Sequence, residues 1–577
     1  MEVRIKFFYI FLILSFLTLV SRLFYWQVVR GKSLADLARL QYRGGVELNA
    51  PRGDILASDN SWLVAGNTAW LLYASPKELE GDVEKISQNL AEILVDRDEN
   101  NREDMLLSET LRISGLLSKK QSVWVPVKRK VGRTTKTEIE SLNIKGLGFQ
   151  EEETRTYPEG SIAAHLLGFA GKDEYGKDKG YFGLEGYYDL VLTGNSGYQN
   201  READPRGVPI LFSGNLNYTP AVGGVNLVTS IDKTIQLTSE TYLKKGIESY
   251  GASGGSVVVM DPKTGNILAM ASYPSFDPMT YSEYGDSFFK NPIISSTYEP
   301  GSIMKVIVMA SALDAGVVSS DTKCPECDGP FKVGKYYIGT WNDKYNPNAT
   351  MTEVIVKSDN VGMTYVGNLL GKDRMYDYLS KFGIGRNTGI DLQGESSVSI
   401  REKGTWNDVD LATSSFGQGV AVTPIQMIRA VSAIANLGIL PVPKVISKLS
   451  SGDWNEDVKP NFEGRVISEK AAREITAMMV EAAKSGESKW TYLRGFRIAG
   501  KTGTAQIPIE GHYDPDQTIA SYIGFAPHDD PKFAMLVTLI KPQSSPWASE
   551  TAAPLWYKIA KDIFDYYGIQ PDLRSNE

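Results

Sequence analysis

A serine and a lysine that could carry out acyl transfer stand three positions apart, at Ser302 and Lys305. Pro300 and Gly301 come directly before them, and the apolar run that follows is typical of a buried helix. Residues three apart share a helix face, so the lysine amine would lie near the serine hydroxyl. If burial or a second cation keeps the amine neutral, it can take the serine proton and activate the oxygen as a nucleophile.

This pair alone is a weak signal, because Ser-x-x-Lys occurs by chance and a serine at a helix start is more often a simple cap. Two further stretches strengthen it, Ser358-Asp359-Asn360 and Lys501-Thr502-Gly503-Thr504. In order, the three stretches read S-x-x-K, S-D-N and K-T-G, a set found in class A β-lactamases and penicillin-binding proteins. Three short motifs in this order are far more specific than any one of them.

The local pattern also predicts the elements that must position these residues. Lys501 falls in an extended stretch whose glycines let a ligand backbone approach closely. Four strands are predicted at residues 256–261, 266–271, 519–525 and 533–540, and two helices at 233–250 and 552–567. We therefore expect Lys501 to lie on a strand of one antiparallel sheet, with both helices packed on that sheet.

Over nearly its whole length the chain resembles the class B penicillin-binding proteins, the monofunctional D,D-transpeptidases that cross-link bacterial peptidoglycan. Besides the three motifs, the resemblance rests on Ala50-Pro51-Arg52-Gly53-Asp54-Ile55-Leu56, Asp261-Pro262-Lys263-Thr264-Gly265, Phe416-Gly417-Gln418-Gly419 and Val422-Thr423-Pro424. The residues around Ser302 and Ser358 are more similar to the division-type branch than to the elongation-type branch. Asp359 departs from the pattern, because class B enzymes commonly have a small polar residue there and aspartate is familiar from class A β-lactamases.

The resemblance implies an α+β fold class: a membrane anchor, a mixed α/β pedestal of the dimerisation-domain type, and a penicillin-binding/β-lactamase-like transpeptidase domain with an antiparallel sheet and flanking helices. The expected boundaries are 1–6 for a cytoplasmic N-terminus, 7–28 for the transmembrane anchor, 29–228 for the pedestal and 229–570 for the transpeptidase domain. Within the pedestal the pattern predicts helices at 81–94 and 104–117 and a strand at 123–130. No pedestal residue is expected to have a chemical role.

The resemblance also implies catalytic roles for the motif residues. Ser302 would attack the carbonyl carbon of the penultimate D-Ala in a stem peptide that ends in D-Ala-D-Ala, with Lys305 as its base. Ser358 would relay a proton to the leaving amine, and Asn360 would hold Lys305 and the substrate amide. Lys501 would lower the pKa of the Lys305 amine and attract the substrate carboxylate.

Thr502, Gly503 and Thr504 are expected to bind substrate, with both threonine hydroxyls donating to its terminal carboxylate. The backbone N–H groups of Ser302 and Thr504 would stabilise the oxyanion. We expect no cofactor and no metal. The implied ligands are stem peptides and β-lactams, and the implied partners are a membrane glycan polymerase and division-machinery proteins.

Residues 7–26 form an apolar run of about 20 residues, enough to cross a bilayer core of roughly 30 Å. Arg4 and Lys6 precede the run and no Ala-x-Ala-like cleavage site follows it. We therefore expect an uncleaved, single-pass anchor in the cytoplasmic membrane, with the catalytic domain on the extracytoplasmic side. A removed signal peptide is the alternative. The net charge of −8 gives no support for nucleic-acid binding.

Cys324 and Cys327 are the only cysteines. A zinc site would need two more ligands, which no nearby Cys or His supplies. Outside the cytoplasm, a local disulfide or a redox-sensitive thiol pair is the better interpretation. The only histidines, His165, His512 and His528, have no recognisable triad setting, which weakens a Ser-His-Asp mechanism.

Three other functions remain open. A D,D-carboxypeptidase or β-lactamase would use the same motifs but must admit and activate water, and the long pedestal and single anchor argue against both. A non-enzymatic β-lactam sensor would need a cytoplasmic signalling portion larger than the six residues expected before the span. A catalytically inactive division scaffold is opposed by the intact motifs. No second catalytic region for glycan polymerisation is recognised, so that activity is expected from a partner.

Overall fold

The computed structural model describes residues 2–30, 43–48, 50–95, 101–174, 176–202, 218–509 and 512–572. The chain forms two compact units, residues 1–52 with 193–224 and residues 53–192 with 225–577. The smaller unit contains the apolar N-terminal segment, and the larger unit contains all three predicted catalytic motifs. Residues 31–42, which belong to the predicted pedestal, lie outside the described residues.

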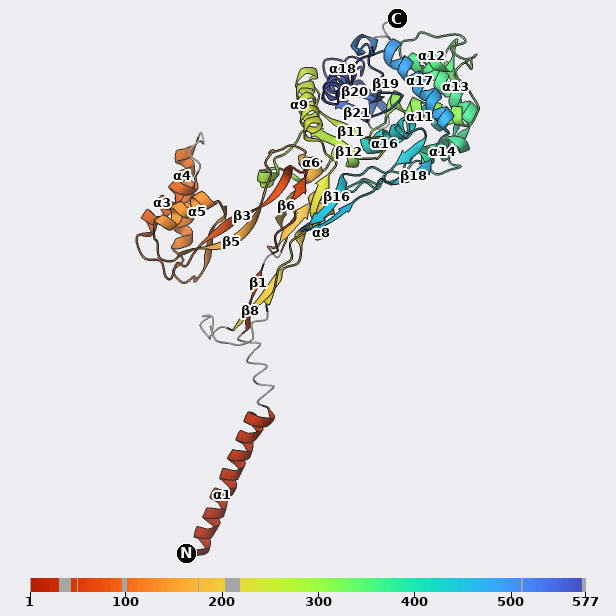
Figure 1. Cartoon of the computed structure of the whole chain (residues 1–577). Coiled ribbons are helices and arrows are strands. Elements are labelled where there is room, and N and C mark those ends of the chain that lie inside the picture. Colours follow the sequence, from red (N-terminus) through yellow and green to blue (C-terminus); the bar gives the residue numbers. More distant parts are fainter. Residues whose placement is uncertain are drawn as a thin grey trace. The chain divides into compact units, whose positions relative to one another are not determined.

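The smaller unit begins with a long apolar helix. Helix α1 (Glu2–Phe24; Figure 1) continues as a π-helical turn, η1 (Tyr25–Val29). The apolar side chains of this segment are exposed. The apolar part of this helix extends from Arg4 to Val29. At 1.5 Å per residue it is about 39 Å long, enough to cross a membrane as predicted. The unit also contains a small antiparallel sheet of β1 (Arg43–Leu48), β8 (Gly197–Glu202) and β9 (Tyr218–Thr219).

In the larger unit, a seven-stranded sheet joins parts of the chain that are far apart in sequence. Its strands run in the order β17-β16-β10-β2-β3-β4, and β5 also pairs with β3. They are β2 (Ile55–Leu56), β3 (Trp62–Ala74), β4 (Val125–Val131), β5 (Leu147–Thr156), β10 (Asn226–Thr229), β16 (Ile446–Ser451) and β17 (Trp454–Asp457). Residue 228, the predicted end of the pedestal, lies in β10, which pairs with β2 on one side and with β16 on the other.

Three helices pack together with β3, β4 and β5. They are α3 (Val83–Leu94), α4 (Arg102–Leu117) and α5 (Arg133–Ser141). Buried apolar side chains from these helices and strands, among them Leu72, Leu90 and Ile113, form a core of their own. The two helices and the strand that the sequence predicts within the pedestal are confirmed, with ends that differ by one or two residues.

The catalytic motifs lie around a five-stranded antiparallel sheet with the strand order β12-β11-β21-β20-β19. Its strands are β11 (Gly254–Met260), β12 (Ile267–Tyr273), β19 (Ala499–Ile509), β20 (His512–Ala526) and β21 (Phe533–Ile540). Successive residues of a strand point to opposite faces. In β21, Met535 and Val537 accordingly belong to one core, and Ala534 and Leu536 belong to another. Both faces of the sheet are therefore covered.

One face of this sheet is covered by α9 (Lys233–Tyr250) and α18 (Ala552–Tyr566), the two helices predicted to pack there (Figure 1). The other face is covered by α16 (Pro424–Ala435) and α17 (Glu469–Ser485), which also pack against α11 (Met304–Asp314). Helices on both faces of a sheet make a three-layer arrangement. The predicted α+β class with an antiparallel sheet and flanking helices is confirmed.

The other described elements are further helices, short strands and single helical turns. In the first half of the chain they are α6 (Ala164–Leu167), β6 (Phe169–Lys172), β7 (Asp178–Tyr181), α7 (Gly183–Tyr187), α8 (Asp189–Thr193), η2 (Pro278–Glu283) and η3 (Asp286–Phe288). In the second half they are α10 (Pro292–Ser295), η4 (Gly301–Ile303), β13 (Phe331–Val333), β14 (Tyr336–Ile338), α12 (Met351–Val356), α13 (Asn360–Leu370), α14 (Lys372–Lys381), α15 (Asp408–Ser414), β15 (Ile439–Pro441), β18 (Phe462–Arg465) and η5 (Lys489–Thr491).

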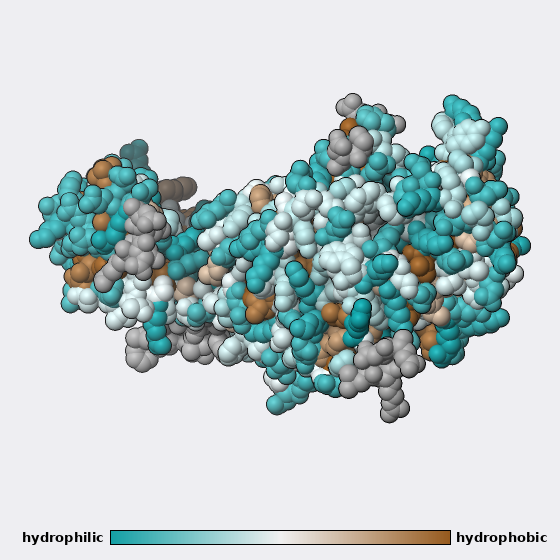
Figure 2. Space-filling model, turned by 90° about the horizontal axis from the view of Figure 1, so that it is seen from above, coloured by the Kyte–Doolittle hydropathy of each residue, from teal (hydrophilic) through white to brown (hydrophobic). Residues whose placement is uncertain are grey.

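Cys324 and Cys327 form a disulfide, so the first of the two interpretations favoured by the sequence is confirmed. Within the described ranges, no group of His, Cys, Asp and Glu side chains is arranged to hold a metal ion. On the face seen in Figure 2, most residues are hydrophilic or intermediate, and hydrophobic residues lie in small separate groups. Such a surface is expected for protein in contact with water.

Candidate active site

The predicted nucleophile lies at the start of a buried helix. The turn η4 leads directly into α11, as the Pro-Gly pair before Ser302 predicts. Every residue from Met304 to Leu313 is buried, so α11 carries Lys305 into the core of the domain. Ser302 is only half-buried and faces a pocket. One helix start therefore places a hydroxyl at the surface of the pocket and an amine beneath it.

The amine of Lys305 is completely buried and hydrogen-bonded. Its Nζ donates to the backbone oxygen of Ser358 and to Oδ1 of Asn360, each at 2.7 Å. Ser358 Oγ lies 3.3 Å from the same nitrogen. The second motif therefore surrounds the lysine of the first.

The second motif forms the connection between α12 and α13. Ser358 has a left-handed backbone conformation, with φ of 55°, and so ends one helix before the next begins. Asp359 is the N-cap of α13, and its Oδ1 accepts from the N–H groups of Val361 at 2.8 Å and Gly362 at 3.1 Å. Aspartate is among the preferred N-cap residues. The residue that departs from the common class B pattern thus has a structural role in this chain.

Lys501 lies on β19, as the sequence predicts, and its amine reaches the same serine. Nζ donates to Ser358 Oγ at 3.0 Å and to Thr502 Oγ1 at 3.1 Å. Ser358 Oγ therefore lies between two lysine amines that are 53 residues before it and 143 residues after it in the chain. The fold brings all three predicted motifs together in one cluster.

Burial is the main influence on both amines. It lowers the pKa of Lys305 to about 7, helped by the charge of Lys501 and opposed by the carboxylates of Glu487 and Asp359. Burial also lowers the pKa of Lys501, again opposed by Glu487. A lysine with a pKa of about 7 is substantially neutral near neutral pH, so Lys305 can act as a base.

The pocket above Ser302 is lined by residues from all three motifs. Its lining consists of Gly301, Ser302, Trp341, Ser358, Asn360, Phe416, Gln418, Glu487, Thr504 and Trp547. Among the described residues, the hydrogen bonds of the Lys305 amine go to Ser358 and Asn360 and none goes to Ser302. Catalytic hydrogen bonds are often loose in a free enzyme and tighten when substrate binds.

The two threonines of the third motif have different partners. Thr502 Oγ1 donates to Oε2 of Glu487 at 2.6 Å. Thr504 Oγ1 accepts from the N–H of Ala548 at 3.1 Å, which leaves the hydroxyl proton of Thr504 free to donate. Of the two hydroxyls predicted to bind a substrate carboxylate, one is therefore already bonded to a carboxylate of the protein.

Close backbone packing holds the turn that carries Ser302. A Cβ added to Gly503 would lie 2.8 Å from the Ile303 side chain, and one added to Gly417 would lie 2.1 Å from Gly301 O. Gly301 N also donates to Gly417 O at 3.0 Å. Only glycine fits at positions 503 and 417, so β19 and the loop 416–419 can both lie directly against the turn.

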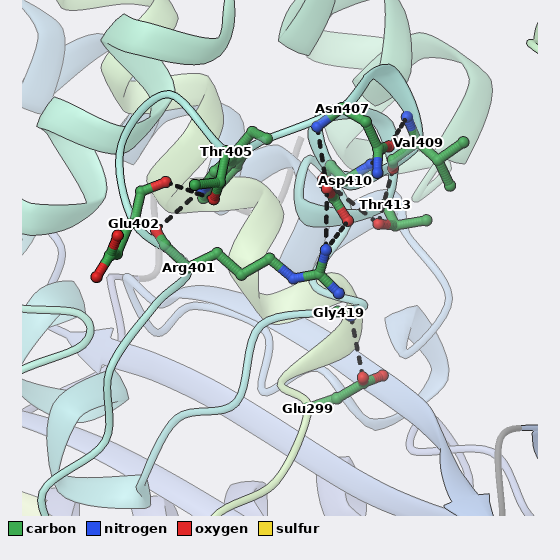
Figure 3. A network of polar contacts seen from close by, with 10 residues as sticks. Glu299, Arg401, Glu402, Thr405, Asn407, Val409, Asp410, Thr413 and Gly419 are labelled. Carbon is green, nitrogen blue, oxygen red and sulfur yellow. Dashed lines mark hydrogen bonds and ion pairs between the residues drawn. The ribbon is translucent and has the colours of Figure 1, made fainter.

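Glu299 connects the same loop to the segment before Ser302. Its carboxylate accepts from Gly419 N at 3.0 Å and from the Tyr513 hydroxyl at 3.0 Å. Figure 3 shows the contact between Glu299 and Gly419 beside a second network of polar contacts. In that network Arg401 forms an ion pair of 3.0 Å with Asp410, which lies at the start of α15. The contact between Glu299 and Gly419 holds the loop 416–419, which contributes Phe416 and Gln418 to the pocket.

Known proteins are similar to this chain in both sequence and fold. The penicillin-binding protein transpeptidase domain family matches residues 255–565, and the penicillin-binding protein dimerisation domain family matches residues 47–229. Stage V sporulation protein D of Bacillus subtilis is 33% identical over 581 aligned residues, which cover 100% of this chain and 87% of that protein. The chain belongs to the class B penicillin-binding proteins.

Other penicillin-binding proteins show the same relationship. Peptidoglycan D,D-transpeptidase FtsI of Escherichia coli is 32% identical over 438 aligned residues, 75% of this chain and 71% of that protein. The structure of penicillin-binding protein 3 from Mycobacterium tuberculosis in complex with aztreonam has a TM-score of 0.70 and 25% identity, and the alignment covers 92% of this chain and 99% of that one. Penicillin-binding protein 2X from Streptococcus thermophilus has a TM-score of 0.74 and 25% identity over 91% of this chain and 80% of that one.

Three residues in the pocket of this penicillin-binding protein were not predicted from its sequence. They are Glu487, which follows α17, and the tryptophans Trp341 and Trp547, whose rings lie 5.3 Å apart at 59°. In the sequence, the only local indication that either tryptophan has a functional role is its position in a stretch of mostly polar residues. No pattern marks Glu487, because it reaches the site through tertiary packing.

Proposed function

We propose that this penicillin-binding protein cross-links stem peptides through an ester formed on Ser302, during synthesis of the division septum. Membership of the family makes the chain a serine D-Ala-D-Ala transpeptidase. The observation that supports the proposed residues is the position of Ser358 Oγ between the amines of Lys305 and Lys501, beside the pocket that Ser302 faces. Such an arrangement can move protons within one buried site without a histidine.

In the first half-reaction, Ser302 Oγ attacks the carbonyl carbon of the penultimate D-Ala while neutral Lys305 accepts the hydroxyl proton. A bond forms between the serine oxygen and this carbon, and the amide bond to the terminal D-Ala breaks. The departing amine receives a proton that Ser358 relays from the Lys305 ammonium. The terminal D-Ala leaves, and the remaining peptide stays on the enzyme as an ester.

In the second half-reaction, an amine of a neighbouring stem attacks the ester carbonyl. A new amide bond forms, the bond to Ser302 Oγ breaks, and the proton lost by the attacking amine returns to Ser302 through Lys305. Asn360, which accepts from Lys305 through Oδ1, keeps the amine in place during both steps. Splitting the transfer in this way lowers the barrier of each step.

The backbone N–H groups of Ser302 and Thr504 are the proposed oxyanion donors, and removing one such donor typically costs about 100- to 1,000-fold in rate. In support, a Cβ added to Gly301 would lie only 3.0 Å from Thr504 O, so the two backbones are in close contact beside the pocket. Lys501 and the hydroxyls of Thr502 and Thr504 bind the terminal carboxylate, and Gly503 allows the peptide to approach its strand.

We place α1 across the cytoplasmic membrane as a single span, with Arg4 and Lys6 on the cytoplasmic side. Residues 29–228 form the pedestal, and residues 229–570 form the catalytic domain on the outside. The Cys324–Cys327 disulfide supports this topology, because disulfides persist in oxidising compartments and are rare in the cytosol. A membrane glycan polymerase and proteins of the division machinery are the proposed partners.

Peptidoglycan cross-linking during sporulation is a second candidate role. The relative named Stage V sporulation protein D aligns with the whole of this chain, whereas the residues around Ser302 and Ser358 favour septal synthesis. Depletion of the protein in its own organism separates the two roles. Filamentous growth with a block in septation supports the septal role, and normal division with defective spores supports the other.

The ester is tested by the intact mass of the full chain in detergent, before and after incubation with benzylpenicillin. We expect a stable adduct of one penicillin per chain in the native protein and none in Ser302→Ala. An adduct that persists in Ser302→Ala would reject the nucleophile. Rapid return to free protein with hydrolysed drug would instead indicate a carboxypeptidase or β-lactamase.

A further inference from the structure

A carboxylate of the protein occupies part of the K-T-G site. Glu487 lies in the connection between α17 and η5, is half-buried, and lines the same pocket as Ser302. Its Oε2 accepts from Thr502 Oγ1 at 2.6 Å. This length is typical of a hydrogen bond from a hydroxyl to an ionised carboxylate, which is about twice as strong as a neutral one.

This bond leaves Thr502 with no proton for a ligand. A threonine hydroxyl has a single proton, and that of Thr502 points to Glu487. The oxygen of Thr502 also accepts from Lys501 Nζ at 3.1 Å. An incoming carboxylate can therefore be bound by Thr502 only after the bond to Glu487 has broken.

The charges lead to the same conclusion. Two carboxylates at one site repel each other, and a like charge nearby disfavours the ionised form of both. Glu487 also acts on both lysines, since its negative charge raises the pKa of Lys305 and of Lys501 against the lowering effect of burial. A ligand carboxylate would thus compete with Glu487 both for the Thr502 proton and for the positive charge of Lys501.

We propose that Glu487 is a specificity-determining residue that occupies the K-T-G carboxylate site of the free enzyme and must be displaced by the carboxylate of each incoming acyl donor. The inference rests on the proposed function, in which the donor is a peptide with a terminal carboxylate. Glu487 thereby slows acylation by free anionic ligands and favours donors that make further contacts elsewhere in the pocket.

The test compares two acylating probes on the full chain in detergent: benzylpenicillin, which carries a carboxylate, and its methyl ester, which is neutral at that position. In Glu487→Gln the side chain keeps its shape but loses its charge. We expect the ratio of the acylation rate constants, acid over ester, to rise about tenfold, equivalent to about 1.4 kcal/mol. The ratio does not depend on the fraction of active protein, so a partly unfolded variant still gives an answer.

Glu481→Gln is the matched control, because Glu481 is an exposed residue of α17 whose carboxylate accepts from Ser485 Oγ and does not line the pocket. We expect its ratio to equal that of the native protein. A ratio that stays unchanged or falls in Glu487→Gln would overturn the proposal. If the ratio stays unchanged because both rate constants rise equally, Glu487 acts through the lysines instead. Failure of the proposed function is distinguishable, because it appears as labelling that persists in Ser302→Ala.

Discussion

The buried amine of Lys305 donates a 2.7 Å hydrogen bond to the backbone oxygen of Ser358. A second acceptor, Oδ1 of Asn360, lies at the same distance. A neutral lysine amine has two N–H donors and one lone pair, so these two acceptors can satisfy both donors and leave the lone pair for a proton. The site therefore suits a neutral base, in agreement with the pKa of about 7 to which burial lowers Lys305.

Replacing this base tests its role. Lys305→Met keeps most of the buried apolar stem but removes the amine, and we expect acylation by benzylpenicillin to fall about 100- to 10,000-fold. Ser358 O and Asn360 Oδ1 lose a donor, so the free energy of unfolding should fall by about 1–3 kcal/mol. Lys357→Met, at an exposed lysine of the same region, is the control and should retain both values. If Lys305→Met reacts at the native rate, another group is the base.

The rate of acylation should depend on pH. The active form of Lys305 is the neutral amine, so the rate constant should rise as pH increases through about 7 and level off above it. The charge of Lys501 contributes to the low pKa of Lys305, so Lys501→Gln should move the midpoint to higher pH. Rate constants measured between about pH 5 and 9 check both expectations. A flat native profile, or a midpoint that moves to lower pH, would contradict this account.

The close approach of Gly417 to the turn that carries Ser302 leads to a further prediction. Gly417→Ala forces a Cβ to within 2.1 Å of Gly301 O at a φ of 82°, so the loop 416–419 must move away from the turn. Gly404→Ala is the control, because its φ is 87° but nothing lies within 4 Å of an added Cβ. The free energy of unfolding of Gly404→Ala should fall only by the cost of a left-handed backbone at alanine, about 1–2 kcal/mol.

We expect the free energy of unfolding to fall more in Gly417→Ala than in Gly404→Ala. We also expect Gly417→Ala, but not Gly404→Ala, to be acylated at least about tenfold more slowly than the native protein, because misplacing reactive groups by about 1 Å can lower a rate about 100-fold. Thermal unfolding and intact-mass kinetics measure the two effects. Equal behaviour of the two variants would mean that the contact with Gly301 is unimportant.

Asp359 offers a test of whether its charge or its capping bonds matter. Asp359→Ala removes the acceptor for two N–H groups at the start of α13 and should cost about 1 kcal/mol of stability. Asp359→Asn keeps an acceptor and should retain nearly native stability and acylation. Differential scanning calorimetry and benzylpenicillin labelling measure these effects. Loss of labelling in a stable Asp359→Asn protein would indicate a chemical role for the carboxylate.

Much of this protein follows from local sequence. The apolar run of α1, the Pro-Gly start of the helix that carries Ser302, and the strands and helices of the catalytic domain were predicted with small errors at their ends. Each depends on periodicity, turn residues or length within one short segment, and these are local properties. The three motifs also indicated the family and predicted which residues come together around Ser358 Oγ.

Tertiary structure decided the relations between distant segments. Ser358 Oγ meets Lys501 across 143 residues, β10 pairs with β16, and Glu487 reaches Thr502 although no motif marks it. The choice between a disulfide and free thiols at Cys324 and Cys327 was likewise left open by their spacing. These outcomes depend on how helices and sheets pack, because packing sets which side chains are buried, which donors are satisfied and which charges face one another. A local pattern contains none of that information.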